Sequence, residues 1–165
     1  MVCSRTDMEA IYEKYKNSVF SIGFNYFKNS TDADDVVQET FLKLYREILR
    51  GKIFESEDHL RNWLIRVAVN ECKRVTLSTW MKKKVNIEEF AGTVDFSGSD
   101  ETGLFEAVMN LPKKYRQVVH LYYFEDYSTA EIGKILGLSQ SAVSTRLLRA
   151  RKLLKVKLAE VWKDE

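Results

Sequence analysis

Apolar side chains recur at intervals of three and four residues along most of the chain, which is the spacing of amphipathic helices. In the N-terminal half this pattern predicts three long helices, over about residues 7–27, 31–49 and 57–81. Thr31 with Asp34 three residues later matches a capping box, which predicts the start of the second helix. Gly51 follows the predicted end of that helix, where a glycine commonly terminates a helical segment.

Helical spacing resumes at Leu104, is interrupted at Leu111 and Pro112, and continues to about Phe124. Two shorter helices are expected over about residues 129–136 and 140–160. Residues 85–103 contain three glycines and no basic side chain, and their weak periodicity is typical of a linker. The sequence therefore predicts an all-α protein with two small helical domains, residues 5–83 and 104–163, joined by a flexible acidic linker, residues 84–103.

Charge is sorted along the chain, although the 165 residues carry a net charge of only +2. Residues 59–85 and 107–165 are basic, with net charges of +6 and +5, whereas residues 1–58 and 86–106 are acidic, with −3 and −6. Blocks of this kind are typical of binding surfaces and linkers. The near-neutral total therefore does not argue against a nucleic-acid partner.

Several functional classes find no support in the sequence. Cys3 and Cys72 form no CxxC pair, and the two histidines lie far apart, so we expect neither a disulfide scaffold nor a zinc site. No P-loop, HExxH or GxSxG motif is present, and we expect no catalytic residue, metal or cofactor. The chain also lacks an apolar run long enough to span a bilayer and an apolar signal segment, which favours the cytoplasm.

Residues 127–151 have the pattern of a helix-turn-helix. Ser128 and Glu131 form an S-x-x-E capping box at the start of the first helix. Gly137 supplies the turn, and Ser139 is placed to cap the second helix. Gly133 is small where the two helices cross. This motif predicts DNA binding, although helix-turn-helix motifs also serve protein contacts.

The second helix of this motif has two distinct faces. Its inward face is apolar and comprises Val143, Leu147, Ala150 and Leu154. Its outward face offers small polar, methyl-bearing and cationic groups that suit a DNA major groove: Ser141, Thr145, Leu148, Arg149 and Lys152. Arg146 and Arg151 lie at the margins of this face and could contact the DNA backbone. A basic helix face that meets only solvent is the alternative.

The N-terminal half contains two further amphipathic helices with unusual faces. On the helix over residues 31–49, one face is buried (Val37, Phe41, Leu44, Ile48), and the other mixes acids with apolar groups: Asp35, Gln38, Glu39, Leu42 and Tyr45. That face fits either a partner protein or the charged rim of a crowded core.

The next helix gathers Arg66, Asn70, Lys73 and Arg74 on one side, followed by Trp80 and three lysines. This combination of cations, an amide and an aromatic ring suits single-stranded or distorted DNA.

Three segments together resemble a known family. They are DADDVVQETFLKLYR, LRNWLIRVAVNECKR and the long segment LPKKYRQVVHLYYFEDYSTAEIGKILGLSQSAVSTRLLRARKLL. In this order and spacing they resemble the extracytoplasmic-function (ECF) group of bacterial RNA polymerase sigma factors. The resemblance extends over about residues 8–158. It implies an alternative sigma factor that directs promoter-specific transcription initiation and performs no covalent chemistry of its own.

The resemblance also implies a role for each face. The face formed by Asp35, Gln38, Glu39, Leu42 and Tyr45 would dock on the polymerase β′ coiled coil, and the polymerase β flap would be a further contact. In minus-ten recognition Asn70 would contact a flipped-out base, and Arg66, Lys73 and Arg74 would contact phosphates. The minus-thirty-five element would be read through Ser144, Thr145, Arg146, Leu148 and Arg149. The linker would thread toward the active-site cleft, and an anti-sigma factor would hold the protein inactive.

Two other functions remain open from the residues alone. A stand-alone helix-turn-helix regulator would bind duplex DNA tightly without polymerase. A structural adaptor could use the acidic helix face, but it would leave the two basic blocks unexplained. An enzyme lacks any recognisable constellation of catalytic residues in this sequence.

Overall fold

A computed structural model describes the backbone of residues 5–82 and 103–163, and the side chains of residues 7–76 and 103–160. The chain divides into two compact units, residues 1–91 and 92–165, and every described element is helical. The predicted linker, residues 84–103, lies outside the described residues except for Gly103. Each unit is described separately below.

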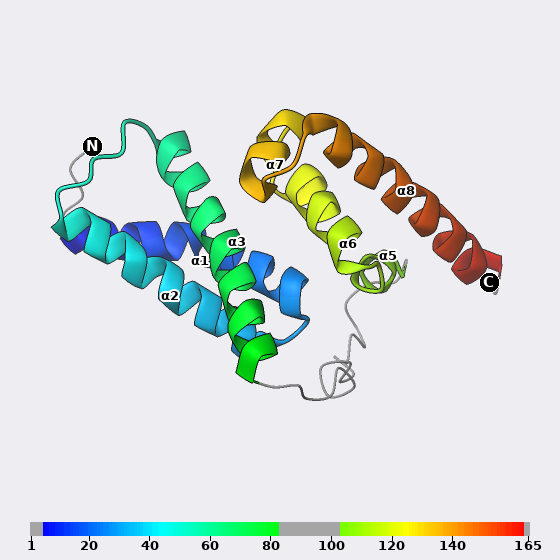
Figure 1. Cartoon of the computed structure of the whole chain (residues 1–165), viewed down its shortest axis with the longest axis horizontal. Helices are drawn as coiled ribbons and strands as arrows, with labels where there is room; N and C mark the ends of the chain where they lie inside the picture. Colours follow the sequence, from blue (N-terminus) through cyan, green and yellow to red (C-terminus); the bar gives the residue numbers. More distant parts are fainter. Residues whose placement is uncertain (1–4, 83–102, 164–165) are drawn as a thin grey trace. The chain divides into compact units, whose positions relative to one another are not determined.

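The first unit is a bundle of three helices, shown in blue to green in Figure 1. They are α1 (Arg5–Phe27), α2 (Ser30–Leu49) and α3 (Glu57–Lys82). Each helix packs against the other two. Where the three helices face one another, Val19, Val36, Leu44, Leu60 and Leu64 are almost completely buried. The apolar residues that recur at helical spacing in the sequence therefore meet in one core.

The turn between α1 and α2 corrects one prediction. Lys28 adopts a left-handed conformation with φ of 56°, and Asn29 is the residue that caps α2. The Asn29 Oδ1 accepts hydrogen bonds from the backbone N–H groups of Thr31 at 2.8 Å and Asp32 at 3.1 Å. The predicted capping box at Thr31 was therefore wrong, because α2 begins at Ser30 with Asn29 as its cap, which places Thr31 inside the first turn.

Glycine at position 23 allows α1 and α2 to approach closely. A Cβ atom at Gly23 would lie 2.9 Å from the Cα of Ala33 and 3.2 Å from the Cβ of Val36. Real Cβ atoms essentially never come within 3.0 Å of a backbone atom, so any larger residue would push the two helices apart. The first unit therefore depends on a small residue here.

The loop between α2 and α3 carries one core residue. Phe54 is fully buried, and its ring meets the ring of Trp63 edge-on at 5.7 Å. Lys52 Nζ lies 5.3 Å from the centre of the Trp63 ring. Trp63 is thus half-buried against its own domain.

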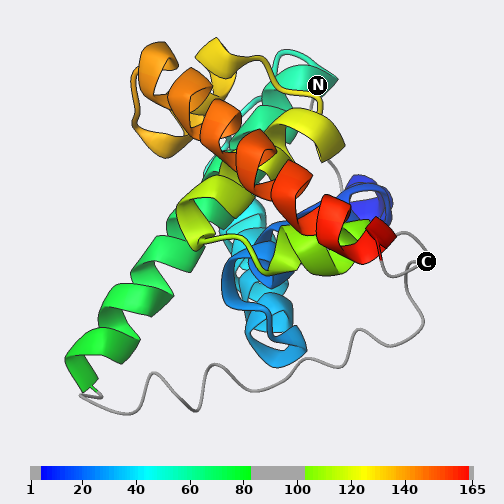
Figure 2. The same cartoon turned by 90° about the vertical axis from the view of Figure 1, so that its right-hand side faces the viewer.

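The second unit, shown in yellow-green to red in Figures 1 and 2, consists of four α-helices and one π-helical turn. These are α5 (Leu104–Met109), α6 (Lys113–Val119), the π turn η1 (His120–Phe124), α7 (Thr129–Leu136) and α8 (Gln140–Lys163). The helix predicted to continue to Phe124 therefore changes to π geometry after Val119. The long helix α8 packs against α5, α6 and α7, and so organises the unit.

A buried arginine joins α6 to the end of α5. Arg116 is 4% exposed, and its Nη1 donates to the carbonyl oxygens of Leu111 at 3.0 Å and Met109 at 3.4 Å. Met109 is the last residue of α5 and Leu111 lies just after it, a place where backbone carbonyls generally lack helical partners, so the guanidinium supplies donors there. Burial lowers the pKa of Arg116 to about 10, which still leaves it charged at neutral pH.

Replacing Gly23 by valine should destabilise the first unit by about 1–3 kcal/mol, because the added side chain overpacks the α1–α2 contact. Ala10→Val on the exposed part of α1 is the control, with an expected cost of about 0.5 kcal/mol from helix propensity alone. Urea unfolding followed by the amide NMR signals of α1 to α3 measures this unit by itself. Equal costs for the two substitutions would contradict the close approach at Gly23.

Candidate nucleic-acid and protein interfaces

The helix-turn-helix predicted at residues 127–151 is present in the second unit. Ser128 Oγ accepts the backbone N–H of Glu131 at 3.2 Å, and Ser139 Oγ accepts that of Ala142 at 3.1 Å. Both predicted caps therefore exist. Gly137 ends α7 with φ of 71°, the left-handed conformation that glycine adopts without strain.

The turn leaves no room for a side chain at position 133. A Cβ atom there would lie 2.6 Å from the carbonyl oxygen of Leu138. The backbone N–H of Leu138 also donates to the Gly133 carbonyl at 2.8 Å. A further hydrogen bond joins Gln140 Nε2 to the hydroxyl of Thr129 at 3.0 Å, so the starts of α7 and α8 are tied together. These contacts fix the direction in which α8 leaves the turn.

The outward face of α8 presents the residues predicted to read DNA. Val143, Leu147 and Ala150 are at most 1% exposed. Six of the seven predicted residues are exposed: Ser141, Ser144, Thr145, Leu148, Arg149 and Lys152. Arg146 is half-buried. The exposed face therefore combines hydroxyls, one leucine and two cations, which are groups that can contact phosphates, base edges and thymine methyl groups.

Arg151 is engaged within its own domain. Its Nε donates to the hydroxyl of Tyr123 at 2.7 Å, and its guanidinium lies 5.6 Å from the ring centres of both Tyr122 and Tyr123. The sequence placed this arginine at the margin of the DNA-reading face, and the tyrosine contacts were not foreseen. The consecutive tyrosines at 122 and 123 are the only sequence signal for them.

Helix α3 brings its four predicted nucleic-acid residues onto one exposed stripe. Arg66, Asn70, Lys73 and Arg74 are all exposed to solvent. Cations and an amide on one stripe can hold a nucleic-acid strand by its phosphates and leave a polar group for a base. The side chain of Trp80 and residues 82–84, which continue this basic segment in the sequence, lie outside the described side chains.

A buried carboxylate lies next to this stripe and was missed by the sequence reasoning. Glu71 is 1% exposed, and its side chain pairs with Lys43 of α2 and with Arg74. Burial by itself would raise the pKa of Glu71, but hydrogen bonds and charges from Lys43 and Arg74 outweigh this effect and lower the pKa. Glu71 is the only acid in the basic block of residues 59–85, which is the signal that could have identified it.

The mixed face of α2 opens into a hollow between α1 and α2 with a volume of about 530 Å³. Three of the five residues predicted for this face line it: Gln38, Leu42 and Tyr45. Asp35 is exposed and Glu39 half-buried beside the hollow. Tyr12 of α1, 40% exposed and edge-on to Phe41 at 5.0 Å, also lines it and was not predicted. Exposed leucine and tyrosine around a hollow favour a protein partner over the rim of a crowded core.

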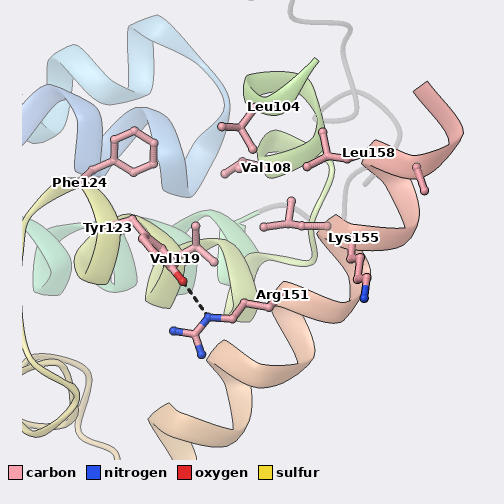
Figure 3. Close-up of a pocket in the computed structure, with 10 residues that line it drawn as sticks. Leu104, Val108, Val119, Tyr123, Phe124, Arg151, Lys155 and Leu158 are labelled. Atoms are coloured by element: carbon pink, nitrogen blue, oxygen red, sulfur yellow. Dashed lines mark hydrogen bonds between the residues drawn. The ribbon is translucent and has the colours of Figure 1, made fainter. Parts of the chain in front are cut away.

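The second unit carries a larger apolar groove of about 600 Å³, shown in Figure 3. It lies between α5, the η1 turn and the C-terminal half of α8. Its apolar lining includes Leu104, Val108, Tyr123, Phe124 and Leu158, while Arg151 and Lys155 contribute positive charge. Leu104, Tyr123 and Phe124 are 43–62% exposed. An apolar surface of this kind fits the hydrophobic side of a partner helix.

Within the described residues, no helix has the length and apolar character required to cross a membrane. The same residues contain no group of three or more histidine, cysteine or acidic side chains that could hold a metal ion.

Two sequence families match the chain, one for each unit. The family described as Sigma-70 region 2 matches residues 11–81, and the family described as Sigma-70, region 4 matches residues 103–154. Among curated proteins, RNA polymerase sigma factor SigV of Bacillus subtilis is 29% identical over 156 residues, which cover 88% of this chain and 87% of the relative. ECF RNA polymerase sigma factor SigW of the same organism is 27% identical, with coverage of 92% and 88%.

Solved structures share the fold at lower identity. The sigma factor RpoE of Bartonella quintana, solved with the anti-sigma factor NepR, has a TM-score of 0.70 and 18% identity, and the match covers 94% of this chain and 98% of that one. CnrH, solved with the cytosolic domain of CnrY, has a TM-score of 0.61 and 21% identity, with coverage of 95% and 90%. These similarities confirm the predicted all-helical fold with two domains.

Removing the cap of α8 should weaken the helix-turn-helix. Ser139→Ala deletes the acceptor for the Ala142 N–H and should cost about 0.5–2 kcal/mol in the stability of the second unit. Ser144→Ala, an exposed serine inside the same helix, should instead gain up to about 0.5 kcal/mol from helix propensity. Urea unfolding followed by the amide NMR signals of α6 to α8 distinguishes the two, and a loss from Ser144→Ala as large as that from Ser139→Ala would refute the capping role.

Proposed function

This chain belongs to the extracytoplasmic-function group of bacterial RNA polymerase sigma factors, and we propose that its exposed faces divide the work of promoter recognition among separate helices. In this proposal residues 5–83 act as sigma region 2 and residues 104–163 as sigma region 4. Residues 84–103 form the linker between them, directed toward the polymerase active-site cleft. As a sigma factor the protein is an initiation factor, and it acts in the cytoplasm without covalent chemistry of its own.

One observation carries the proposal: in both units the helix face opposite the core bears the groups that its role requires. The α2 face borders a hollow with exposed apolar groups, and it suits the polymerase β′ coiled coil. The α3 stripe is cationic with a central amide, and it suits the melted non-template strand at the minus-ten element. The outward face of α8 suits the major groove at the minus-thirty-five element.

The apolar groove of the second unit gives the β flap of polymerase a place to bind. Its exposed leucine, tyrosine and phenylalanine need a partner with apolar side chains. The sigma factor RpoE, which has a similar fold, was solved with the anti-sigma factor NepR, and we extend that mode of control to this chain. An anti-sigma factor that covers the α2 hollow or the groove would compete directly with polymerase.

The α3 stripe and the outward face of α8, each of which is proposed to bind DNA weakly, bind it more tightly when both are held on the same polymerase. Because each binds a short element, joining them on one enzyme makes the second contact effectively intramolecular. Run-off transcription with core polymerase on a library of promoter sequences tests the whole proposal. Selection of two elements at a fixed spacing is the expected result, and tight specific binding to duplex DNA without polymerase would instead support a stand-alone regulator.

Arg149→Ala should weaken selection of the minus-thirty-five element by about 1–3 kcal/mol while binding to core polymerase stays the same. Arg149 is exposed in the middle of the outward face of α8. Lys157→Ala, an exposed cation further along the same helix, is the control. An in vitro transcription assay with altered minus-thirty-five sequences measures the effect, and unchanged promoter preference in Arg149→Ala would contradict the proposal.

Gln38→Ala combined with Leu42→Ala should reduce binding to the β′ coiled coil, because both side chains line the α2 hollow. Arg46→Ala with Leu49→Ala removes one polar and one exposed leucine side chain from the same helix outside the hollow, and it should bind normally. A pull-down with the isolated coiled coil compares the two double variants. Equal binding by both would remove the hollow from the docking surface.

A further inference from the structure

Glu71 occupies an unusual position for a carboxylate. It lies on the predicted DNA-binding helix, directly after Asn70, and is the only acid in the basic block of residues 59–85. At 1% exposure it is buried, and its two oxygens serve different helices. Lys43 of α2 pairs with Oε1, and Arg74 of α3 pairs with Oε2 through Nε at 3.0 Å and Nη2 at 2.9 Å. The carboxylate is therefore a bridge between α2 and α3.

Arg74 remains accessible even though Glu71 holds it. Its side chain is 58% exposed. The planar guanidinium carries five N–H donors, and Glu71 engages one edge of the fork, which leaves Nη1 for another acceptor. Much of the rotational freedom of this long side chain is thus lost before any ligand arrives, so less is lost when a ligand binds.

The bridge also lies where two proposed surfaces meet. Lys43 is on α2, four residues after Glu39 of the docking face, and so one turn further along that helix. The charge of Glu39 is close enough to contribute to the raised pKa of Arg74, whose largest cause is the hydrogen bond to Glu71. The polymerase-docking face and the DNA-binding stripe therefore join at these side chains.

We propose that Glu71 is a positioning residue for the promoter strand: anchored to α2 by Lys43, it orients the Arg74 guanidinium so that the exposed edge binds a DNA phosphate. This inference rests on the proposed function, because it requires the α3 stripe to contact the minus-ten strand. Besides the residues that are proposed to contact DNA, it assigns a role in DNA binding to Glu71, which does not itself contact DNA.

Whether removal of the Glu71 charge weakens or strengthens DNA binding distinguishes a positioning role from simple electrostatic repulsion. A carboxylate beside a DNA-binding stripe repels phosphates, so its removal alone would strengthen DNA binding. If Glu71 instead holds Arg74 in its binding orientation, removing the negative charge weakens binding. A purely structural role would change stability without changing the number of phosphates contacted.

The test measures binding of holoenzyme to a fluorescent fork-junction DNA that carries the best promoter from the transcription library, over a series of salt concentrations. Glu71→Gln should weaken binding about 3- to 10-fold and lower the slope of log affinity against log salt by about 0.7, the loss of one phosphate contact on a single strand. Arg74→Gln should give the same loss. The double variant should bind no more weakly than Arg74→Gln alone, because both substitutions remove one contact.

Glu47→Gln is the matched control. Glu47 also pairs with cations, Arg50 at 3.3 Å and Lys52 at 3.9 Å, and its substitution removes the same unit of negative charge from α2. It should leave both affinity and salt slope unchanged. Unchanged or tighter binding by Glu71→Gln, or additive losses in the double variant, would overturn the positioning role.

Two further variants keep the test decisive. If the amide NMR spectrum shows that Glu71→Gln is unfolded, Arg74→Lys replaces it in the test. A lysine keeps the positive charge but lacks the forked guanidinium, so DNA binding should fall as in Arg74→Gln. DNA binding at the wild-type level by Arg74→Lys would overturn the proposal. Arg66→Gln tests the stripe independently of Glu71. If both Glu71→Gln and Arg66→Gln leave the salt slope unchanged, the proposed function of α3 fails. If Arg66→Gln lowers the salt slope and Glu71→Gln does not, only the positioning role of Glu71 is rejected.

Discussion

Close approach of two backbones at a glycine determines the geometry of each unit. In the first unit Gly23 lets α1 lie against Ala33 of α2, and in the second Gly133 lets the turn carbonyl of Leu138 lie against α7. The orientation of a helix decides which of its faces is buried, so these contacts also decide which faces meet solvent. The proposed docking face of α2 and the proposed DNA-reading face of α8 both depend on them.

The sequence was sufficient to predict most of the helices because their buried stripes are long and regular. The C-terminal end of α2 and both caps of the helix-turn-helix follow from local patterns. Local rules failed at the start of α2, where Asn29 and Thr31 are both residue types that cap helices. The Asn29 side chain accepts the hydrogen bonds of the free N–H groups, so Asn29 and not Thr31 is the cap. Local rules also gave no indication of the π turn at residues 120–124.

The candidate surfaces were predictable as faces but not as contacts. Exposure of Arg149 or Asn70 follows from its place opposite an apolar stripe. In contrast, the pairing of Glu71 with Lys43 joins residues 28 positions apart, and Arg151 reaches Tyr123 across the same separation. Such partners depend on how helices cross in three dimensions, which periodicity along one helix does not contain. Roles on DNA and polymerase came from the family resemblance rather than from spacing.

The separation of core and reading faces on α8 has an evolutionary consequence. Because Val143, Leu147 and Ala150 are buried whereas Ser141, Thr145 and Arg149 are exposed, substitutions at the exposed positions change the surface at a cost usually within about 0.5 kcal/mol. Under the proposed function, duplicated copies of such a gene are therefore free to diverge in minus-thirty-five preference without losing the fold. Helix α3 has less freedom, since its stripe includes Arg74, which also compensates a buried charge.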